Sequence, residues 1–211
     1  MPTPWRTGYT FKGWFTSSGT PVTASSLVPE ADWTLTAYWA AKSYTISFNP
    51  AGGKAVKPKT VVYDSAYGTL PSTSRSGYVF VGWFTSAGIK VTASSRLTTV
   101  GTQTLLAHWA KSRLVRFNAN HGTLSVHSKT VGQGLAYGTL PVPKRAGYAF
   151  SGWYTKESGG THVTAASRLT ATKTTTLYAH WRKVTTPSGH WVRVSLANPE
   201  STDHALLRDP I

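Results

Sequence analysis

One phrase of the sequence decides the fold: Gly77-Tyr78-Val79-Phe80-Val81-Gly82-Trp83-Phe84-Thr85. The same pattern of Gly-Tyr-x-Phe-x-Gly-Trp, an aromatic residue and Thr occurs at residues 8–16 and again at 147–155. Each copy is followed by a Val-Thr-Ala phrase and then by a closing strand that ends in Trp. So wide a match in register is not a product of chance, and the chain of 211 residues is a tandem array of one module.

The two later copies also share an opening half, at residues 44–71 and 114–141. It contains an alternating strand that ends in Phe-Asn, a glycine turn, a Lys-Thr-Val strand and the phrase Ala-Tyr-Gly-Thr-Leu-Pro. Residues 1–41 lack this half, so we expect either that the chain is a fragment or that its true start lies upstream. The sequence predicts four segments: a closing half module over 1–41, complete modules over 42–110 and 111–182, and a non-repeat tail or linker over 183–211.

Residues within each module alternate as strands do. In Tyr44-Thr45-Ile46-Ser47-Phe48 the apolar side chains recur with period two, which is typical of a half-buried strand. The glycine pair that follows and a returning strand over 60–63 predict a hairpin. The other expected strands are those over 78–83 and 104–109, with turn dihedrals or a bulge at Gly77 and Gly82.

A short helical turn is expected over 94–97, so each module is predicted to hold about four strands with a helical or irregular crossover. The fold class is therefore mainly β, or α+β. A unit of about 70 residues is near the lower limit for a self-sufficient core. Large aromatic rings compensate for the small size of the module, because each ring buries a large apolar area. Those expected to supply most of the second module's core are Phe48, Tyr78, Phe80, Trp83 and Trp109.

The combined pattern of these phrases resembles the Listeria–Bacteroides repeat, the module type of the B repeats of internalin-like proteins. The resemblance covers residues 44–110 and 113–182 well, and residues 4–39 as a half module. It implies β-grasp-like modules, export in bacteria, and service as spacer or adhesive modules of large cell-surface proteins, without catalysis. The chain shows no leucine-rich or anchoring domain, so ligands that such domains bind in relatives do not carry over to it.

Composition and charge narrow the class of protein. Charged residues make up only 14%, and nine Trp and ten Tyr favour a β protein over a helical bundle. There is no Cys, which excludes disulfides, Cys-ligated zinc and thiol catalysis. No segment has the apolar run of a signal peptide or of a membrane span. The net charge of +15 is uneven, since residues 111–182 carry ten basic side chains and one acidic one.

Candidate chemistry is scarce. Asp64 and Glu157 are the only acidic residues of the two complete modules and lie in different modules, so neither module holds an acid–base pair. The spacing of Gly77 and Gly82 is that of a phosphate-binding loop, but the Lys-Ser/Thr that should follow is Trp-Phe. A catalytic site, a metal and a cofactor are therefore not expected. Two further motifs, interpreted as structural or exposed, are the sortase-like Leu70-Pro71-Ser72-Thr73-Ser74 and the histidines His108, His121, His127 and His180.

Two functions stay open at this point. The first is a non-enzymatic, extracellular spacer of a bacterial cell-surface protein, built of monomeric modules and adhesive toward a host or neighbouring cell. The second is a polyanion-binding module for glycosaminoglycans or other anionic glycans, cell-wall polymers or nucleic acid, the last without sequence specificity. Its candidate residues cluster in the last module: Lys111, Arg113, Arg116, Lys144 and Arg145. A smaller cluster is formed by Lys54, Lys57 and Lys59.

Overall fold

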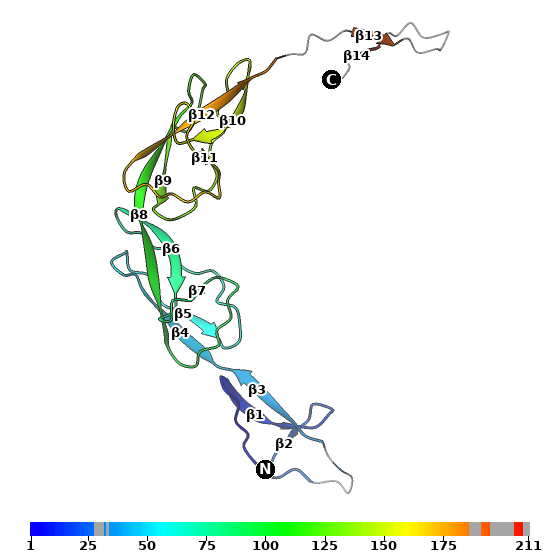
Figure 1. The fold of residues 1–211 in the computed structure, drawn as a ribbon. Coiled ribbons are helices and arrows are strands. Elements are labelled where there is room, and N and C mark those ends of the chain that lie inside the picture. Colours follow the sequence, from blue (N-terminus) through cyan, green and yellow to red (C-terminus); the bar gives the residue numbers. More distant parts are fainter. Residues whose placement is uncertain (28–31, 33, 186–190, 195–204, 209–211) are drawn as a thin grey trace. The chain divides into compact units, whose positions relative to one another are not determined.

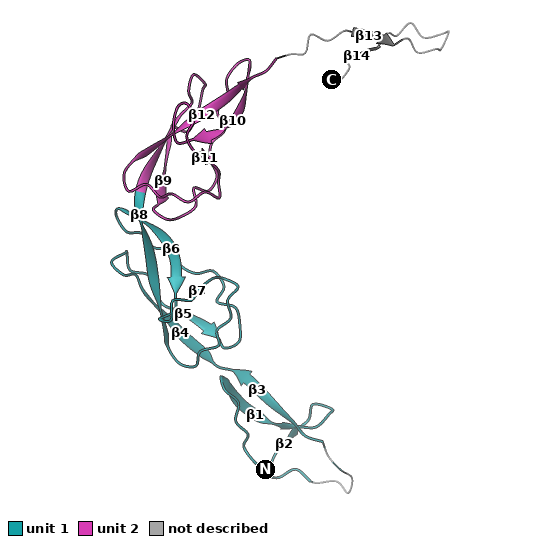
Figure 2. Cartoon of the chain, viewed as in Figure 1, with its two compact units in different colours: residues 1–112 teal, residues 113–211 magenta. Residues whose placement is uncertain are grey.

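A computed structural model describes residues 1–27, 32, 34–185, 191–194 and 205–208, the last two ranges by their backbone (Figure 1). The chain divides into two compact units, Met1–Ser112 and Arg113–Ile211, which are described separately (Figure 2). Within the described residues the secondary structure consists of strands, turns and loops, with no helix. The prediction of a mainly β chain built of tandem sheets is confirmed, and a β-grasp topology stays a prediction.

The half module at the start of unit 1 forms a small antiparallel sheet. Its strands are β1 (Tyr9–Phe15), β2 (Pro21–Val22) and β3 (Thr36–Ala41), in the order β2-β1-β3. β1 pairs with both neighbours, while β3 has one partner and leaves its other side as a sheet edge. The sheet is therefore built from the closing half of the repeat alone.

The first complete module adds the strands that the half module lacks. They are β4 (Ser43–Asn49), β5 (Lys59–Val62), β6 (Tyr78–Phe84), β7 (Lys90–Val91) and the start of β8 (Gln103–Asn118). β4 and β5 form the predicted antiparallel hairpin. β4 also pairs in parallel with β8, with Ile46 opposite Gln103, so the opening half and the closing half share one sheet.

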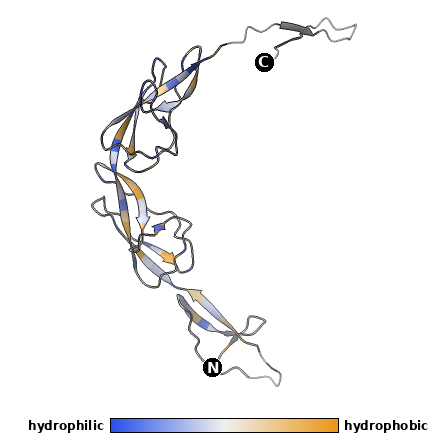
Figure 3. Cartoon of the chain, in the orientation of Figure 1, coloured by the Kyte–Doolittle hydropathy of each residue, from blue (hydrophilic) through white to orange (hydrophobic). Residues whose placement is uncertain are grey.

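The second complete module repeats this arrangement in unit 2. The end of β8 plays the part of β4, and it is joined by β9 (Ser128–Gly132), β10 (Tyr148–Tyr154), β11 (His162–Val163) and β12 (Thr175–Lys183). β12 runs parallel to β8, with Thr175 opposite Val115. Apolar and polar residues alternate along β8 and β12, as Figure 3 shows by colour, because one face of each strand packs on the core.

Each complete module encloses its own hydrophobic core. In the first, Trp83 is 1% exposed and stands among three aliphatic side chains that are fully buried, Ile46, Leu97 and Leu105. In the second, Trp153 is surrounded in the same way by Val115, Leu169 and Leu177.

The predicted aromatic core is therefore right only in part. Phe48 and Trp83 are buried, and Phe80 and Trp109 pack against the cluster from its edge. Tyr78 does not belong to the core, because its ring lies beneath the guanidinium of Arg75 at 4.0 Å. Tyr67 and aliphatic residues from both halves of the module supply the remaining interior.

A glycine bulge interrupts the central strand of every module. The register of β6 against β8 shifts between Phe80 and Gly82, where the glycine has φ +141°. β1 and β10 shift at the equivalent glycines, Gly13 and Gly152. The register shifts confirm the predicted bulge. Residues with a side chain rarely adopt this φ, which explains why the phrase needs its second glycine.

The crossover between β7 and β8 is irregular rather than helical. A single turn at residues 93–94 is closed when the Thr92 amide donates to Ser95 Oγ and the Ser95 amide donates to the Thr92 carbonyl, at 3.0 and 3.1 Å. Arg96 then bridges to Ala66, and Leu97 enters the core. These partners end the turn after one cycle, so the helical turn expected over 94–97 does not form.

After residue 185, the described part of the tail is a pair of short strands. β13 (Trp191–Val194) and β14 (Ala205–Arg208) pair antiparallel, with Trp191 opposite Arg208. The other residues of the predicted tail after Thr185 lie outside the described residues.

Candidate functional site

The five cations predicted to bind a polyanion all lie on or beside strands of the last module. Lys111, Arg113 and Arg116 are on β8, while Lys144 and Arg145 precede β10. The side chains of Lys111, Arg116 and Lys144 are exposed, and those of Arg113 and Arg145 are half-buried. Lys111 belongs to unit 1, and the other four cations belong to unit 2.

Two of the predicted cations are held by the fold. Arg113 Nη2 donates to Gln133 Oε1 at 3.0 Å. The Arg145 guanidinium lies 3.9 Å from the centre of the Tyr148 ring, and its Nη1 donates to the Asn120 carbonyl at 3.5 Å. The same Arg-over-Tyr contact occurs in the other copies, at Arg6 with Tyr9 and at Arg75 with Tyr78. The repeat of this contact indicates a structural role for Arg145, and the Arg-x-Gly-Tyr phrase carried that signal.

Lysines of the Lys-Thr-Val phrase are structural as well. Lys59 Nζ donates to the carbonyls of Tyr67 and Thr69 at 2.5 and 2.9 Å. Lys129 Nζ makes the equivalent bonds to Tyr137 and Thr139 at 2.7 and 2.9 Å. Each lysine therefore ties its strand to the Tyr-Gly-Thr-Leu-Pro loop. Of the smaller predicted cluster, Lys54 and Lys57 remain exposed.

A surface hollow of about 670 Å³ lies at the end of β8 that belongs to unit 2. Arg116, His121 and His127 line it, and all three side chains are exposed. His121 has φ +67° in the turn after Asn118, whereas the equivalent residue of the first complete module is Gly52, with φ +84°. The sequence predicted Arg116 as a site residue but not its proximity to the two histidines, because the strand and the loop come together only in the folded module.

Tyrosines of the Tyr-Gly-Thr phrase have perturbed acidity. Burial raises the pKa of Tyr137 above its usual value of 10.0. Burial also raises the pKa of Tyr67, and the hydrogen bond that its hydroxyl donates to Gln103 Oε1 opposes this in part. Both rings belong to the cores, so they are packing groups rather than a proton-transfer site.

Histidines on the outer faces of the sheets stack on aromatic rings. His108 lies 4.0 Å from Phe84 between ring centres, and His180 lies 3.9 Å from Tyr154. His180 Nε2 also lies 3.0 Å from the Lys156 carbonyl oxygen. In the described part of the chain, no three His, Cys, Asp or Glu side chains gather where they could hold a metal ion.

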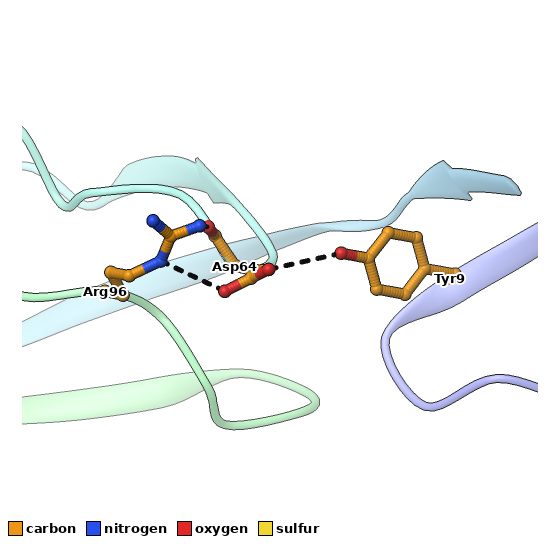
Figure 4. Close-up of polar contacts among 3 residues, drawn as sticks. All are labelled: Tyr9, Asp64 and Arg96. Carbon is orange, nitrogen blue, oxygen red and sulfur yellow. Dashed lines mark hydrogen bonds and ion pairs between the residues drawn. The ribbon is translucent and has the colours of Figure 1, made fainter.

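The acidic residue Asp64 is used as a bridge. Its carboxylate receives Arg96 Nε at 3.0 Å on one oxygen and the Tyr9 hydroxyl at 3.4 Å on the other (Figure 4). Tyr9 comes from the half module, and Asp64 and Arg96 come from the first complete module. The bridge therefore joins two repeats within unit 1.

The remaining motifs are structural parts of the module. Gly77 sits in the turn before β6 with φ +77°, and Gly82 forms the bulge, so their spacing follows from the strand and not from a phosphate. In the sortase-like phrase, Leu70 packs against the core and the Pro71 carbonyl accepts the Trp83 indole N–H at 2.7 Å. No helix that could cross a membrane occurs among the described residues.

Comparison with known proteins identifies the same three tandem repeats as the repeated phrases of the sequence. The Listeria–Bacteroides repeat domain matches residues 1–38, 44–108 and 114–180. A Gly-rich protein named as a membrane protein, from Evansella cellulosilytica, is 28% identical over 84% of this chain and 21% of its own length. A second protein from that organism, also named as a membrane protein, is 28% identical over 84% of the chain and 27% of its own length.

Internalin H of Listeria monocytogenes is 25% identical over 81% of this chain and 37% of its own length. The chain thus spans well under half the length of each of these relatives. The three family matches coincide with the half module and the two complete modules, and they cover most of the residues. The chain belongs to the Listeria–Bacteroides repeat family, of which it carries three tandem copies.

Proposed function

We propose that this chain is a non-enzymatic, extracellular repeat region of a bacterial cell-surface protein that serves as a spacer for other domains. The observation that carries the proposal is that each complete module closes a separate core of its own. A module that is stabilised by its own core and by contacts with its nearest neighbour can be repeated along a chain without other interactions, which suits a stalk. The similarity to Internalin H and to two proteins named as membrane proteins supports the surface location.

The joint between the half module and the first complete module is short and well bonded. Lys42 alone separates β3 from β4; its amide donates to the Gly8 carbonyl and its carbonyl accepts the Tyr63 amide, both at 2.8 Å. The rings of Tyr9 and Tyr63 meet edge to face at 5.6 Å. Because the backbone at this joint is short and hydrogen-bonded, the joint is more typical of a semi-rigid spacer than of a flexible tether.

Module deletion with length-matched replacement tests the spacer role. The chain is displayed on a bacterial surface between an anchor and a reporter domain that binds an immobilised ligand. Deleting residues 113–182 should reduce capture at the ligand surface, and inserting an unrelated β module of the same length should restore it. If the unrelated module fails to restore capture, the repeat contributes more than length and the spacer proposal is wrong.

Polyanion binding is the second candidate, and the charge of the last module favours it. Ten basic side chains against one acidic side chain over residues 111–182 create a field that attracts sulfated or carboxylated polymers. The intact chain should be retained on immobilised heparin at low salt and should elute as salt rises. Passage through the column without retention at low salt would exclude this candidate and leave the spacer role untouched.

A further inference from the structure

We propose that the hollow lined by Arg116, His121 and His127 binds the sulfate or carboxylate group of an anionic oligosaccharide. The inference rests on the polyanion-binding candidate described above, to which it adds a site and a ligand class. At about 670 Å³, the hollow is within the range of small-molecule sites, about 300–1,000 Å³.

The lining of the hollow is rich in hydrogen-bond donors and contains no acidic residue. Arg116 offers a planar fork of N–H groups that matches a sulfate or carboxylate, and its side chain makes no hydrogen bond or ion pair within the described residues. Two side-chain amides and two hydroxyl groups, suited to sugar hydroxyl groups, also line the hollow. The polar side chains that line the hollow are Arg116, Asn118, Asn120, His121, Thr123, His127 and Thr176.

The backbone of His121 gives an independent sign of a binding role. The turn at residues 119–122 uses two left-handed residues, with φ +45° at Asn120 and +67° at His121. The first complete module makes the same turn with Gly52 in place of His121, so the fold does not need an imidazole there. A side chain kept in the left-handed region at an exposed position, where it makes no hydrogen bond, ion pair or ring contact with the described residues, points to a ligand.

A further cation, Lys144, extends the surface around the same turn. Lys144 lines a second hollow of about 350 Å³ together with Thr123 and Leu124. Arg145 lines a third hollow of about 260 Å³, but the acidic Glu157 lines it too and the guanidinium is held over the Tyr148 ring, so this hollow does not favour an anion. Thr123 and Leu124 are therefore shared by two hollows with a cation in each, an arrangement that fits consecutive acidic groups along an oligosaccharide.

The aromatic residues of this surface argue against nucleic acid as the ligand. Binding of single strands relies on exposed rings on which bases stack. The benzene ring in the lining of the 670 Å³ hollow is that of Phe117, which is 5% exposed and packs against Trp153 in the core. The exposed rings of this lining are the small imidazoles of His121 and His127, with no exposed Phe, Tyr or Trp, so the site suits a sugar acid or sulfate better than a base.

Calorimetry of the full chain with a heparin-derived tetrasaccharide at low salt tests the site. Arg116→Ser and His121→Gly install the residues that the first complete module has at these positions, Ser47 and Gly52. Each should lower the affinity about tenfold, the usual effect of losing a charge-assisted hydrogen bond. Lys173→Ser, which removes one exposed charge from the same module outside the hollow, should change it less than about twofold.

Thermal unfolding of the variants separates a binding defect from a folding defect. His121→Gly relieves the left-handed strain, so this variant should unfold at the same or a higher temperature while binding more weakly. If Arg116→Ser and His121→Gly bind as tightly as Lys173→Ser, the hollow is not the site, although the polyanion candidate survives. If the intact chain does not bind, both fail. Tighter binding of a single-stranded oligonucleotide that Arg116→Ser weakens would overturn the glycan assignment.

Discussion

The repeated tryptophan of each module shows how one residue links two parts of the repeat. Its indole N–H donates to a proline carbonyl twelve residues earlier in every copy, at 2.7–2.9 Å: Trp14 to Pro2, Trp83 to Pro71, and Trp153 to Pro141. The rings differ in burial, since Trp83 and Trp153 are almost fully buried and Trp14 is partly exposed. The hydrogen bond therefore belongs to the closing half, and the burial depends on the opening half.

Replacing these tryptophans by phenylalanine should reveal that difference. Trp83→Phe removes buried ring volume and leaves the Pro71 carbonyl without its donor, so the free energy of unfolding of that module should fall by about 2 kcal/mol. Trp14→Phe should cost less than about 1 kcal/mol, because water already reaches that ring. Amide hydrogen exchange of each module measures both values, and equal losses at the two sites would contradict the interpretation.

Tyrosine acidity predicts a loss of stability at alkaline pH. Burial raises the pKa of Tyr137 and of Tyr67 above 10.0, so the folded chain holds these protons more tightly than the unfolded chain. The stabilisation is complete below about pH 10 and declines as the pH rises through the folded values. Ultraviolet titration of the phenols should show two tyrosines that ionise late in the folded chain and with the others in denaturant. Simultaneous ionisation without denaturant would refute this.

Central strands β1, β6 and β10 each carry a bulge that no side chain accommodates well. Gly82 has φ +141°, beyond the left-handed region that Asn tolerates, whereas Gly77 has φ +77°, inside it, and open space beside it. The two glycines of one phrase therefore make different demands on the residue type, although both have positive φ.

Asparagine substitutions distinguish these demands. Gly82→Asn should destabilise the first complete module by about 1–3 kcal/mol, the cost of a residue held in a sparsely populated region. Gly77→Asn should cost less than about 1 kcal/mol, because Asn adopts the left-handed conformation readily. Urea unfolding monitored by the amide signals of β6 and β8 gives both values. A Gly82→Asn variant as stable as Gly77→Asn would mean that the bulge moves at little cost.

The whole chain shows what one half of the repeat can form without the other. In the half module, Trp14, Val22, Leu35 and Ala37 remain partly exposed. The equivalent residues of the first complete module are all buried: Trp83, Val91, Leu105 and Ala107. The closing half sets up the sheet, and the opening half adds the parallel strand and the second layer of side chains that keep water out.

Supplying an opening half should therefore complete the first sheet. A copy of residues 43–69 fused before Met1 places Thr69 next to Met1, which occupies the position of Leu70 in the repeat. β3 should gain a parallel partner, and Trp14 emission should shift to the blue as its ring becomes buried, with slower hydrogen exchange in β1 and β3. A scrambled copy of the same residues is the control. Identical exchange with the native and scrambled copies would contradict this expectation.

Much of the fold follows from local patterns. The strand at Tyr44–Phe48, its hairpin with the Lys-Thr-Val strand and the bulge at Gly82 were all predictable, because period-two alternation and glycine spacing are properties of neighbouring residues. Of the two predicted forms of the crossover, helical or irregular, the irregular one is found, because Ser95 Oγ and the Thr92 carbonyl accept the bonds that close the turn after one cycle, a pairing that composition does not reveal.

Less of the candidate site than of the fold could be predicted from residue identity. The cluster of cations over 111–145 was visible in the sequence, but Arg113 and Arg145 are bound to Gln133 and Tyr148 and serve the fold. Charge counts do not distinguish a free guanidinium from one that is already hydrogen-bonded. The hollow at Arg116 needed the folded turn, which brings His121 and His127 to the end of β8.

The sequence by itself determined that this protein is an array of one β module, because glycine, proline and tryptophan at repeated spacings impose the same turns, bulge and buried ring on each copy. Only the tertiary structure decided that the opening strand of a module runs parallel to its closing strand, as β4 does beside β8. That pairing joins residues about sixty positions apart, and its stability comes from a core that neither half encloses alone. The same closure separates the cations that maintain the module from the few that remain free to bind.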